Sequence, residues 1–167
     1  DRRQRQMCIR DRNKAGLKLS DVLLHQAGLV PFIPFYREVI DTVTGKPLPQ
    51  YFSIIKDALH QYRVAENLFL RNDWEDTLYH RILQSKLGAP GTYVYSDNDF
   101  IFLGKIVEAV SGMPLDQYAR THFYLPLQMN STTFKPRERM PLQVIVPTEE
   151  EHHFRMQLIH GDVHDEG

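Results

Sequence analysis

Cysteine is almost absent from this chain, since Cys8 is the only one among 167 residues. A lone cysteine excludes an internal disulfide framework. No apolar run approaches the roughly 20 residues that a membrane-spanning helix needs. Neither sign of charge dominates, because 20 lysines and arginines face 21 aspartates and glutamates for a net charge of -1. The charge balance therefore gives no indication of a nucleic-acid partner. No secretory signal is visible either, which says nothing about compartment.

The first twelve residues, 1–12, differ from everything that follows. They read DRRQRQMCIRDR, which has five arginines and almost nothing to bury. This text looks like the translation of a sequencing-library adapter, so we expect it to be a disordered artefact that is excluded from fold reasoning. Removing it also removes Cys8, and with it any thiol nucleophile. The alternative is a basic arm for nucleic acid or anionic lipid, although it lacks interleaved aromatic residues.

Residues 13–167 are long enough for one domain with a hydrophobic core. Turn residues divide them into segments, most of which are predicted to be helical. Ser20 is predicted to cap a helix over Asp21 to Gln26. Asp73 opens a second helix that ends before Gly88. Phe100 to Val110 forms a third, apolar nearly all round and therefore expected to be buried. Three further predictions complete the pattern: a helix after Pro114, a strand at Val144 to Val146, and either a strand or a helix for Val64 to Leu70.

Tyr95 stands directly before the third of these helices, in the sequence Tyr95-Ser96-Asp97. Ser96 and Asp99 have the S-x-x-D spacing of a capping box. A phenol has an ordinary pKa near 10, so it acts as a base near neutrality only beside positive charge. A helix N-terminus supplies part of that charge. The alternative is that Tyr95 is a half-buried packing residue and Ser96 a plain cap.

Several segments together resemble the serine β-lactamase-like hydrolases, which include class C-related esterases and penicillin-binding proteins. Tyr95 matches the tyrosine of the family's Y-x-N motif, with Asp97 where asparagine is usual. Leu23 to Leu29, LLHQAGL, is similar to the segment that follows the nucleophile helix. Val163 to Gly167, VHDEG, resembles the stretch before the last motif. The most similar arrangement is the serine-hydrolase domain fused behind a glycoside hydrolase family 3 domain in Bacteroidetes proteins.

Two of the family's three motifs are not present in this chain. The S-x-x-K that carries the nucleophile should precede LLHQAGL, and the K-T-G or H-x-G motif should follow VHDEG. One S-x-x-K does occur at Ser53 to Lys56, but it lies in the wrong order, and we interpret Ser53 as an ordinary loop or helix residue. We therefore expect residues 13–167 to be part of a longer serine hydrolase and to be inactive alone.

The resemblance implies an α+β fold of the serine β-lactamase/transpeptidase type, of which this part is mostly helical with few short strands and little of the central sheet. It implies acyl transfer or hydrolysis of an ester, a β-lactam or a cell-wall peptide through a serine acyl-enzyme. It implies Tyr95 as a catalytic group and Asp97, His164 and Asp165 as substrate-binding residues. It also implies a bacterial, periplasmic or otherwise extracytoplasmic location and no metal or organic cofactor.

Two other functions stay open. Aspartate at position 97 is compatible with a non-catalytic cell-wall-binding or scaffold module of the same fold. His160 and His164 are four residues apart with Asp162 and Asp165 nearby, which could form the zinc site of a metal-dependent hydrolase. However, Gly161 disfavours the helix that such a pair needs, and H-E-x-x-H is not found. Solvated or loop-bonding histidines are the simpler interpretation.

Overall fold

The computed structural model describes residues 13–165, so Cys8, the N-terminal segment 1–12, and Glu166 and Gly167 of the VHDEG stretch lie outside the described residues. The chain divides into two units. The first comprises the described residues up to Ile33 together with Asp76–Ala119, and the second comprises Pro34–Glu75 and the described residues from Arg120 onward. Each is built mainly from segments that are distant in sequence, and each is described here by itself.

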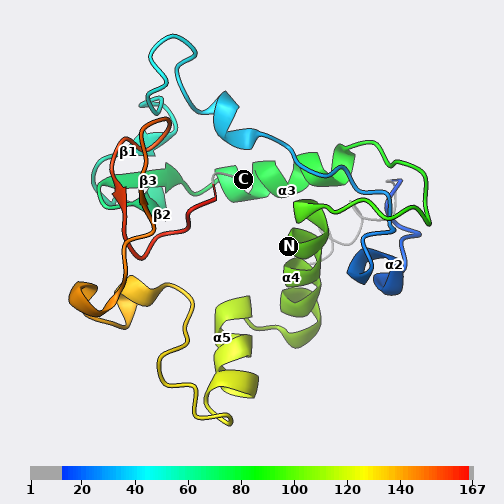
Figure 1. The fold of residues 1–167 in the computed structure, drawn as a ribbon. Coiled ribbons are helices and arrows are strands. Elements are labelled where there is room, and N and C mark those ends of the chain that lie inside the picture. The colour runs from blue at the N-terminus through cyan, green and yellow to red at the C-terminus, as the bar shows by residue number, and fades with distance from the viewer. Residues whose placement is uncertain (1–12, 166–167) are drawn as a thin grey trace. The chain divides into compact units, whose positions relative to one another are not determined.

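The first unit is helical. It contains α2 (Leu19–Leu23), most of α3 (Trp74–Gln84), α4 (Asp97–Ser111) and α5 (Leu115–Ala119). Helix α2 packs against α4, as Figure 1 shows. The core of this contact is Val22, Ala27 and Leu29, which are buried, with Leu17, Leu87, Phe102 and Leu103 packed around them. The helices predicted from Asp73 and over Phe100 to Val110 are thereby confirmed.

Helix α2 is shorter than predicted and ends in a Schellman motif. The N–H of Gln26 donates to the carbonyl of Asp21 (2.7 Å), and the N–H of His25 donates to the carbonyl of Val22 (3.1 Å). This pattern places the residue after the helix in the left-handed region, where glycine is usual. Here that residue is His25, with φ of 55°. The prediction that Ser20 caps this helix is wrong, because Ser20 lies inside α2 and Lys18 occupies the N-cap.

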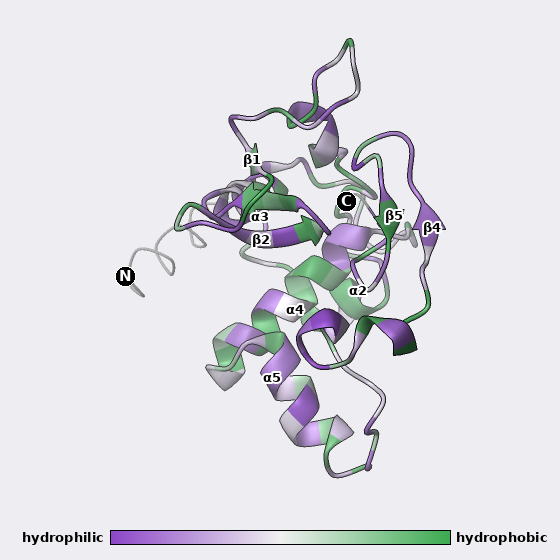
Figure 2. Ribbon diagram, turned by 90° about the vertical axis from the view of Figure 1, so that its left-hand side faces the viewer, coloured by the Kyte–Doolittle hydropathy of each residue, from purple (hydrophilic) through white to green (hydrophobic). Residues whose placement is uncertain are grey.

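Helix α4 begins after Ser96 and ends at Gly112, which adopts the left-handed conformation with φ of 72°. The predicted burial of its apolar face is wrong for the described residues. Phe100 is 56 % exposed and Val110 is 84 % exposed, whereas the buried members of the helix are polar, Asn98 and Asp99. The deepest packing of α4 is thus at its N-terminal turn. Apolar residues are visible along the same helix in Figure 2.

The second unit contains the strands. A three-stranded antiparallel sheet has the order β1-β3-β2, with β1 at Phe52–Ser53, β2 at His60–Ala65 and β3 at Leu68–Arg71. The ambiguous segment Val64 to Leu70 is therefore a β-hairpin. Strands β4 (Glu149–Glu150) and β5 (Leu158–Ile159) form a second antiparallel pair. In Figure 2, β4 is hydrophilic and β5 is hydrophobic, which fits the complete burial of Ile159.

Short helices precede β1 and β4 in the chain. They are η1 (Phe35–Glu38), the π-helical turn η2 (Arg120–Tyr124), η3 (Pro136–Glu138) and η4 (Leu142–Val144). The strand predicted at Val144 to Val146 is wrong, because Leu142–Val144 forms a 3-10 turn after Pro141 and Val146 is 82 % exposed. The core of the unit is aromatic: Phe52 packs edge-on against Phe154, with ring centroids 5.7 Å apart.

Candidate active site

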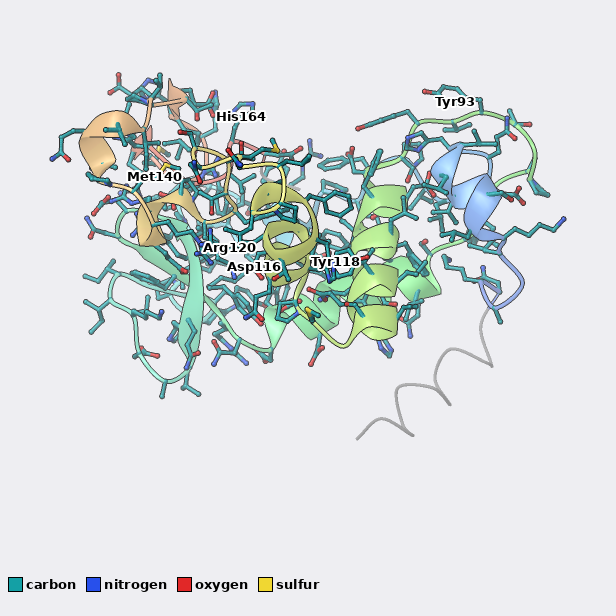
Figure 3. All side chains as sticks on the ribbon, turned by 90° about the horizontal axis from the view of Figure 1, so that it is seen from below. Tyr93, Asp116, Tyr118, Arg120, Met140 and His164 are labelled. Atoms are coloured by element: carbon teal, nitrogen blue, oxygen red, sulfur yellow. The ribbon has the colours of Figure 1, made fainter. Side chains whose placement is uncertain are left out.

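Tyr95 lies on the short connection between α3 and α4, one residue before the N-cap of α4. Its side chain is 55 % exposed, while the next residue, Ser96, is fully buried. Tyr93 is on the same connection, next to α2, as Figure 3 shows. A phenol at this place is accessible to a reacting group and lies near the positive end of the α4 dipole. This arrangement matches the expectation for a catalytic tyrosine, and its role stays a prediction.

The backbone around Tyr95 is held by the segment that follows α2. The N–H of Val94 donates to the carbonyl of His25 (2.9 Å), and the N–H of Asp97 donates to the carbonyl of Pro31 (3.0 Å). Two side chains converge on a third carbonyl, because Ser96 Oγ and Asn98 Nδ2 both lie 2.7 Å from the oxygen of Val30. Residues 25–31, which begin within LLHQAGL, and residues 94–98, which include the Tyr95-Ser96-Asp97 motif, therefore form one hydrogen-bonded structure.

Two glycines bring these segments together. The N–H of Gly88 donates to the carbonyl of Gly28 at 2.7 Å. Gly28 has φ of 76°, and a Cβ atom built on it would lie 2.7 Å from the carbonyl oxygen of Gly88. A side chain at position 28 would therefore clash with backbone as well as strain the chain. The absence of a side chain lets the loop after α2 lie against the connection that carries Tyr95.

His25 and Asp99 form a buried pair beneath the tyrosine. The His25 Nδ1 atom lies 2.8 Å from Asp99 Oδ2, and these side chains are only 10 % and 1 % exposed. Burial raises the pKa of the Asp99 carboxyl, and the contact with His25 offsets part of that shift. The ring of His25 packs against that of Tyr95, with centroids 4.7 Å apart.

The predicted capping box is therefore wrong. No side-chain hydrogen bond caps the described N-terminus of α4. The hydroxyl of Ser96 is directed to Val30 instead, and the carboxyl of Asp99 to His25. Ser96 and Asp99 have the S-x-x-D spacing, but each side chain makes a tertiary contact and neither caps the helix. Sequence reasoning quoted His25 only as part of a motif and missed its pairing with Asp99; a histidine within an otherwise apolar segment was the available signal.

The three proposed substrate-binding residues lie in different units. Asp97 is the first residue of α4 and is half-buried. His164 and Asp165 belong to the second unit, and the side chain of His164, labelled in Figure 3, pairs with Glu149 through an Nδ1–Oε1 distance of 2.7 Å. Tyr95 and Asp97 are thus brought together in the first unit. The roles of all four remain predictions.

A buried ion pair holds the backbone at His164. The guanidinium of Arg155 donates to the carbonyls of Val163 and His164 and pairs with Glu151, whose carboxylate is 3.3 Å from Arg155 Nε. Burial alone raises the pKa of Glu151, but the N–H groups of Phe154, Arg155 and His153, with the Arg155 side chain, outweigh it and lower the pKa. The loop before His164 is consequently fixed by two buried charged residues, Glu151 (4 % exposed) and Arg155 (6 % exposed).

The two histidines considered as zinc ligands have other partners. His160 Nε2 bonds to the carbonyl of Ile145, and His164 Nδ1 bonds to Glu149. Gly161 between them has φ of 74°, which breaks any helix at this point. Across residues 13–165, no three histidine, cysteine, aspartate or glutamate side chains gather as a metal site would require. Ser53, of the out-of-order S-x-x-K, accepts the N–H of Ile55 at 3.2 Å.

Comparison with known proteins gives a consistent result. The beta-lactamase family profile matches residues 9–157. A protein of Escherichia coli (strain K12) named "Putative D-alanyl-D-alanine carboxypeptidase" is 30 % identical over 169 residues, covering 93 % of this chain and 33 % of its own length. A protein with the same name from Salmonella schwarzengrund is 40 % identical over 158 residues, covering 81 % of this chain and 36 % of its own. No solved structure matches significantly.

These relatives are much longer than the region that they share with this chain, which spans about a third of their length. Within residues 13–165, none of the helices has the length and apolar character needed to span a bilayer.

Proposed function

This chain belongs to the beta-lactamase family, and we propose that Tyr95 is the proton-transfer group of a serine hydrolase that works by acyl transfer. The mixed helical and short-stranded fold agrees with that family's α+β class. The observation that carries the proposal is the placement of the tyrosine: an exposed phenol on a backbone fixed on both sides by residues 25–31, directly ahead of the helix α4. Because such a phenol can be positioned without losing access to substrate, it suits general acid–base work.

The proposed reaction assigns one proton path to Tyr95. In the whole protein, the phenolate oxygen takes the proton of a serine hydroxyl as that oxygen attacks an ester or amide carbonyl carbon. The same proton then passes to the leaving oxygen or nitrogen as its bond to the carbonyl carbon breaks. Water, deprotonated by the phenolate, then attacks the acyl carbon, and the phenol returns that proton to the serine oxygen as its bond to the acyl carbon breaks, which releases the acid and restores the phenolate. The serine and a lysine that activates it are expected in an S-x-x-K motif N-terminal to LLHQAGL.

Asp97, His164 and Asp165 are proposed to bind substrate. Asp97 presents a carboxylate where the family usually has an amide, so it would accept hydrogen bonds from substrate N–H or O–H groups and donate none. The backbone of His164 is fixed by Arg155, which supports a role in recognition by a rigid loop. A charged substrate amine is a better partner for the Asp97 carboxylate than a substrate carboxylate is.

We extend the proposal to the whole protein on the strength of its relatives. Its substrate is proposed to be an ester, a β-lactam or a cell-wall peptide. The relatives' name, D-alanyl-D-alanine carboxypeptidase, supports a peptide that ends in D-alanine. It needs no cofactor and acts outside the cytoplasm of a bacterium. A fused glycoside hydrolase family 3 domain is part of the same proposal, supported only by the sequence resemblance of LLHQAGL, Tyr95-Ser96-Asp97 and VHDEG.

The test uses the uninterrupted reading frame expressed with residues 13–167 in place. Time-dependent labelling by a fluorescent penicillin, lost when the S-x-x-K serine is replaced by alanine, is the expected result. Hydrolysis of D-alanyl-D-alanine peptides and of p-nitrophenyl esters then separates the substrate classes. The 167-residue chain alone is expected to give neither labelling nor hydrolysis. Binding of peptidoglycan by the whole protein without any acyl-enzyme would reject the proposal in favour of a cell-wall-binding module.

A further inference from the structure

His25 holds the backbone on both sides of Tyr95. Its carbonyl oxygen accepts the N–H of Val94, at 2.9 Å, and its Nδ1 atom accepts the N–H of Ser96, at 3.3 Å. Its ring also packs against the ring of Tyr95. One residue thus fixes the peptide before the tyrosine, the peptide after it and one face of its side chain. Any change in the orientation of the His25 ring must therefore change the position of the phenol.

The hydrogen bond from Ser96 determines where the protons of this site lie. A backbone N–H cannot reverse its role, so a nitrogen that accepts from it must present a lone pair. His25 Nδ1 therefore carries no proton. The distance from Nδ1 to Asp99 Oδ2 is nevertheless 2.8 Å, which two lone pairs would not adopt. The proton of that contact is then assigned to Asp99, and the single lone pair of Nδ1 is shared between this short bond and the longer one from Ser96.

The second oxygen of Asp99 supports the same assignment. Asp99 Oδ1 is buried and has no hydrogen-bond partner among the described residues. An ionised carboxylate with one buried, unpaired oxygen costs more free energy than a neutral acid whose carbonyl oxygen is unpaired. Burial favours the protonated form of Asp99 as well. Three aromatic rings, those of Tyr93, Tyr95 and Phe100, contact the ring of His25.

We propose that His25 and Asp99 are positioning residues for Tyr95, acting as an uncharged pair in which a protonated Asp99 donates to Nδ1 of a neutral His25. Asp99 orients the imidazole, and the imidazole fixes the tyrosine. The importance of this device for catalysis rests on the proposed function. The protonation pattern and the ring contact do not, because they are properties of the fold.

This pattern has a chemical consequence for the tyrosine. An uncharged pair gives the phenolate no positive charge from beneath, although a histidine lies there. The positive charge that brings a phenol into the range of a base near neutrality must then come from the N-terminus of α4 and from cations that are not in this pair. His25 and Asp99 thus determine the position of the phenol, and other groups determine the pH at which it ionises.

Nuclear magnetic resonance on the 167-residue chain tests the protonation pattern directly. With 15N-labelled histidine, and His25→Asn to assign the signals, Nδ1 of His25 is expected at the shift of an unprotonated ring nitrogen and Nε2 at that of a protonated one. Two protonated nitrogens, or a proton on Nδ1 alone, would overturn the proposal. This measurement needs no activity, so its outcome is independent of the proposed function.

Substitutions at Asp99 test the positioning role. Asp99→Asn offers an amide N–H to Nδ1, so the contacts between the ring protons of His25 and Tyr95 should persist. Asp99→Leu has similar volume and no donor, so these contacts should weaken or disappear. Asp76→Leu makes the same change at an exposed site of α3 and should leave them intact. Equal ring contacts in Asp99→Leu and in the unmodified chain would refute the positioning role.

In the whole protein the same variants are compared by kinetics. We expect Asp99→Leu to lose up to about 100-fold in kcat through misplacement of the phenol, with KM little changed, and Asp99→Asn to recover most of it. Full kcat in Asp99→Leu would overturn the inference. If no serine-dependent activity exists at all, the proposed function fails, while the ring contacts and the 15N shifts still decide the inference about this pair.

Discussion

The imidazole of His25 and the carboxyl of Asp99 meet 2.8 Å apart although 74 residues separate them in the chain. The first follows α2 and the second lies in the first turn of α4, so their contact joins the two segments on which the position of Tyr95 depends. A buried polar contact of this kind is costly when half of it is removed, because the remaining group is left unpaired. Loss of either member of the pair is therefore expected to destabilise the first unit.

The pH dependence of the free energy of unfolding should show whether Asp99 is protonated in the folded protein. Burial raises its pKa above the ordinary value of 3.8, so the folded state holds the proton more tightly than the unfolded state does. The resulting stabilisation is present below pH 3.8 and is lost as pH rises through the raised pKa. Relative to Asp99→Asn, which cannot titrate, the free energy of unfolding of the unmodified chain should fall as pH increases in this range.

Denaturant unfolding of both proteins between about pH 3.5 and 5.5 measures this difference while the unfolded-state histidines remain protonated. Asp76→Asn, which makes the same change at an exposed position of α3, is the control for the substitution itself. A difference that grows with pH would mean that the fold favours the ionised carboxylate of Asp99. That result would also contradict the uncharged pair.

The sequence was informative about this site where the requirement is local. Tyr95 precedes a helix, as predicted, because helix periodicity is set by neighbouring residues. The sequence was misleading where a side chain bonds to a residue that is distant along the chain. Ser96 and Asp99 have the spacing of a capping box, yet each bonds to the segment after α2, and spacing along the chain does not reveal such a contact.

The burial of α4 was mispredicted for a related reason. An apolar helix was expected to be buried all round, but burial depends on what packs against each face, and Phe100 and Val110 have little around them among the described residues. The short strands were also beyond prediction. A pair such as β4 and β5, with two residues each, is formed by contacts between segments and not by a repeating pattern within either one.

Gly28→Ala should destabilise the first unit. The new Cβ would lie 2.7 Å from the carbonyl oxygen of Gly88, and φ of 76° is unfavourable for alanine. We expect a loss of about 1–3 kcal/mol in the free energy of unfolding, measured by denaturant titration. Gly16→Ala is a matched control, since no atom lies within 4 Å of its Cβ position, and it should change stability by less than about 0.5 kcal/mol. Equal effects of the two changes would contradict the close approach of Gly28 and Gly88.

Glu151→Gln should loosen the loop that leads to His164. The ionised carboxylate accepts the N–H groups of His153, Phe154 and Arg155 and pairs with the Arg155 guanidinium. A neutral amide cannot replace all of these bonds, so we expect a loss of about 1–3 kcal/mol at neutral pH. Faster amide hydrogen exchange at residues 153–155 is the measurement. Glu150→Gln, at an exposed neighbouring position, should have little effect.

The same carboxylate gives an acid dependence of opposite sign to that of Asp99. Although burial opposes it, the hydrogen bonds lower the pKa of Glu151 below the ordinary value of 4.5. Its stabilisation is therefore present above pH 4.5 and is lost as pH falls through the lowered pKa. The excess stability of the unmodified chain over Glu151→Gln should shrink on acidification. An excess that is constant from pH 7 to about pH 2 would show that the carboxylate is not held in its ionised form.

Tyr95→Phe in the whole protein should separate chemistry from structure. The change removes only a hydroxyl from a side chain that is 55 % exposed, so the fold and the ring contact with His25 should be retained. Loss of a general base lowers kcat by about 100- to 10,000-fold, and we expect that loss in ester hydrolysis and in the rate of penicillin acylation. Tyr93→Phe removes the same atom two residues earlier, from a ring that is 64 % exposed and also contacts His25, and should leave the rate nearly unchanged. If the two variants are equally active, Tyr95 does not carry the proton, and the base of this hydrolase must be another group.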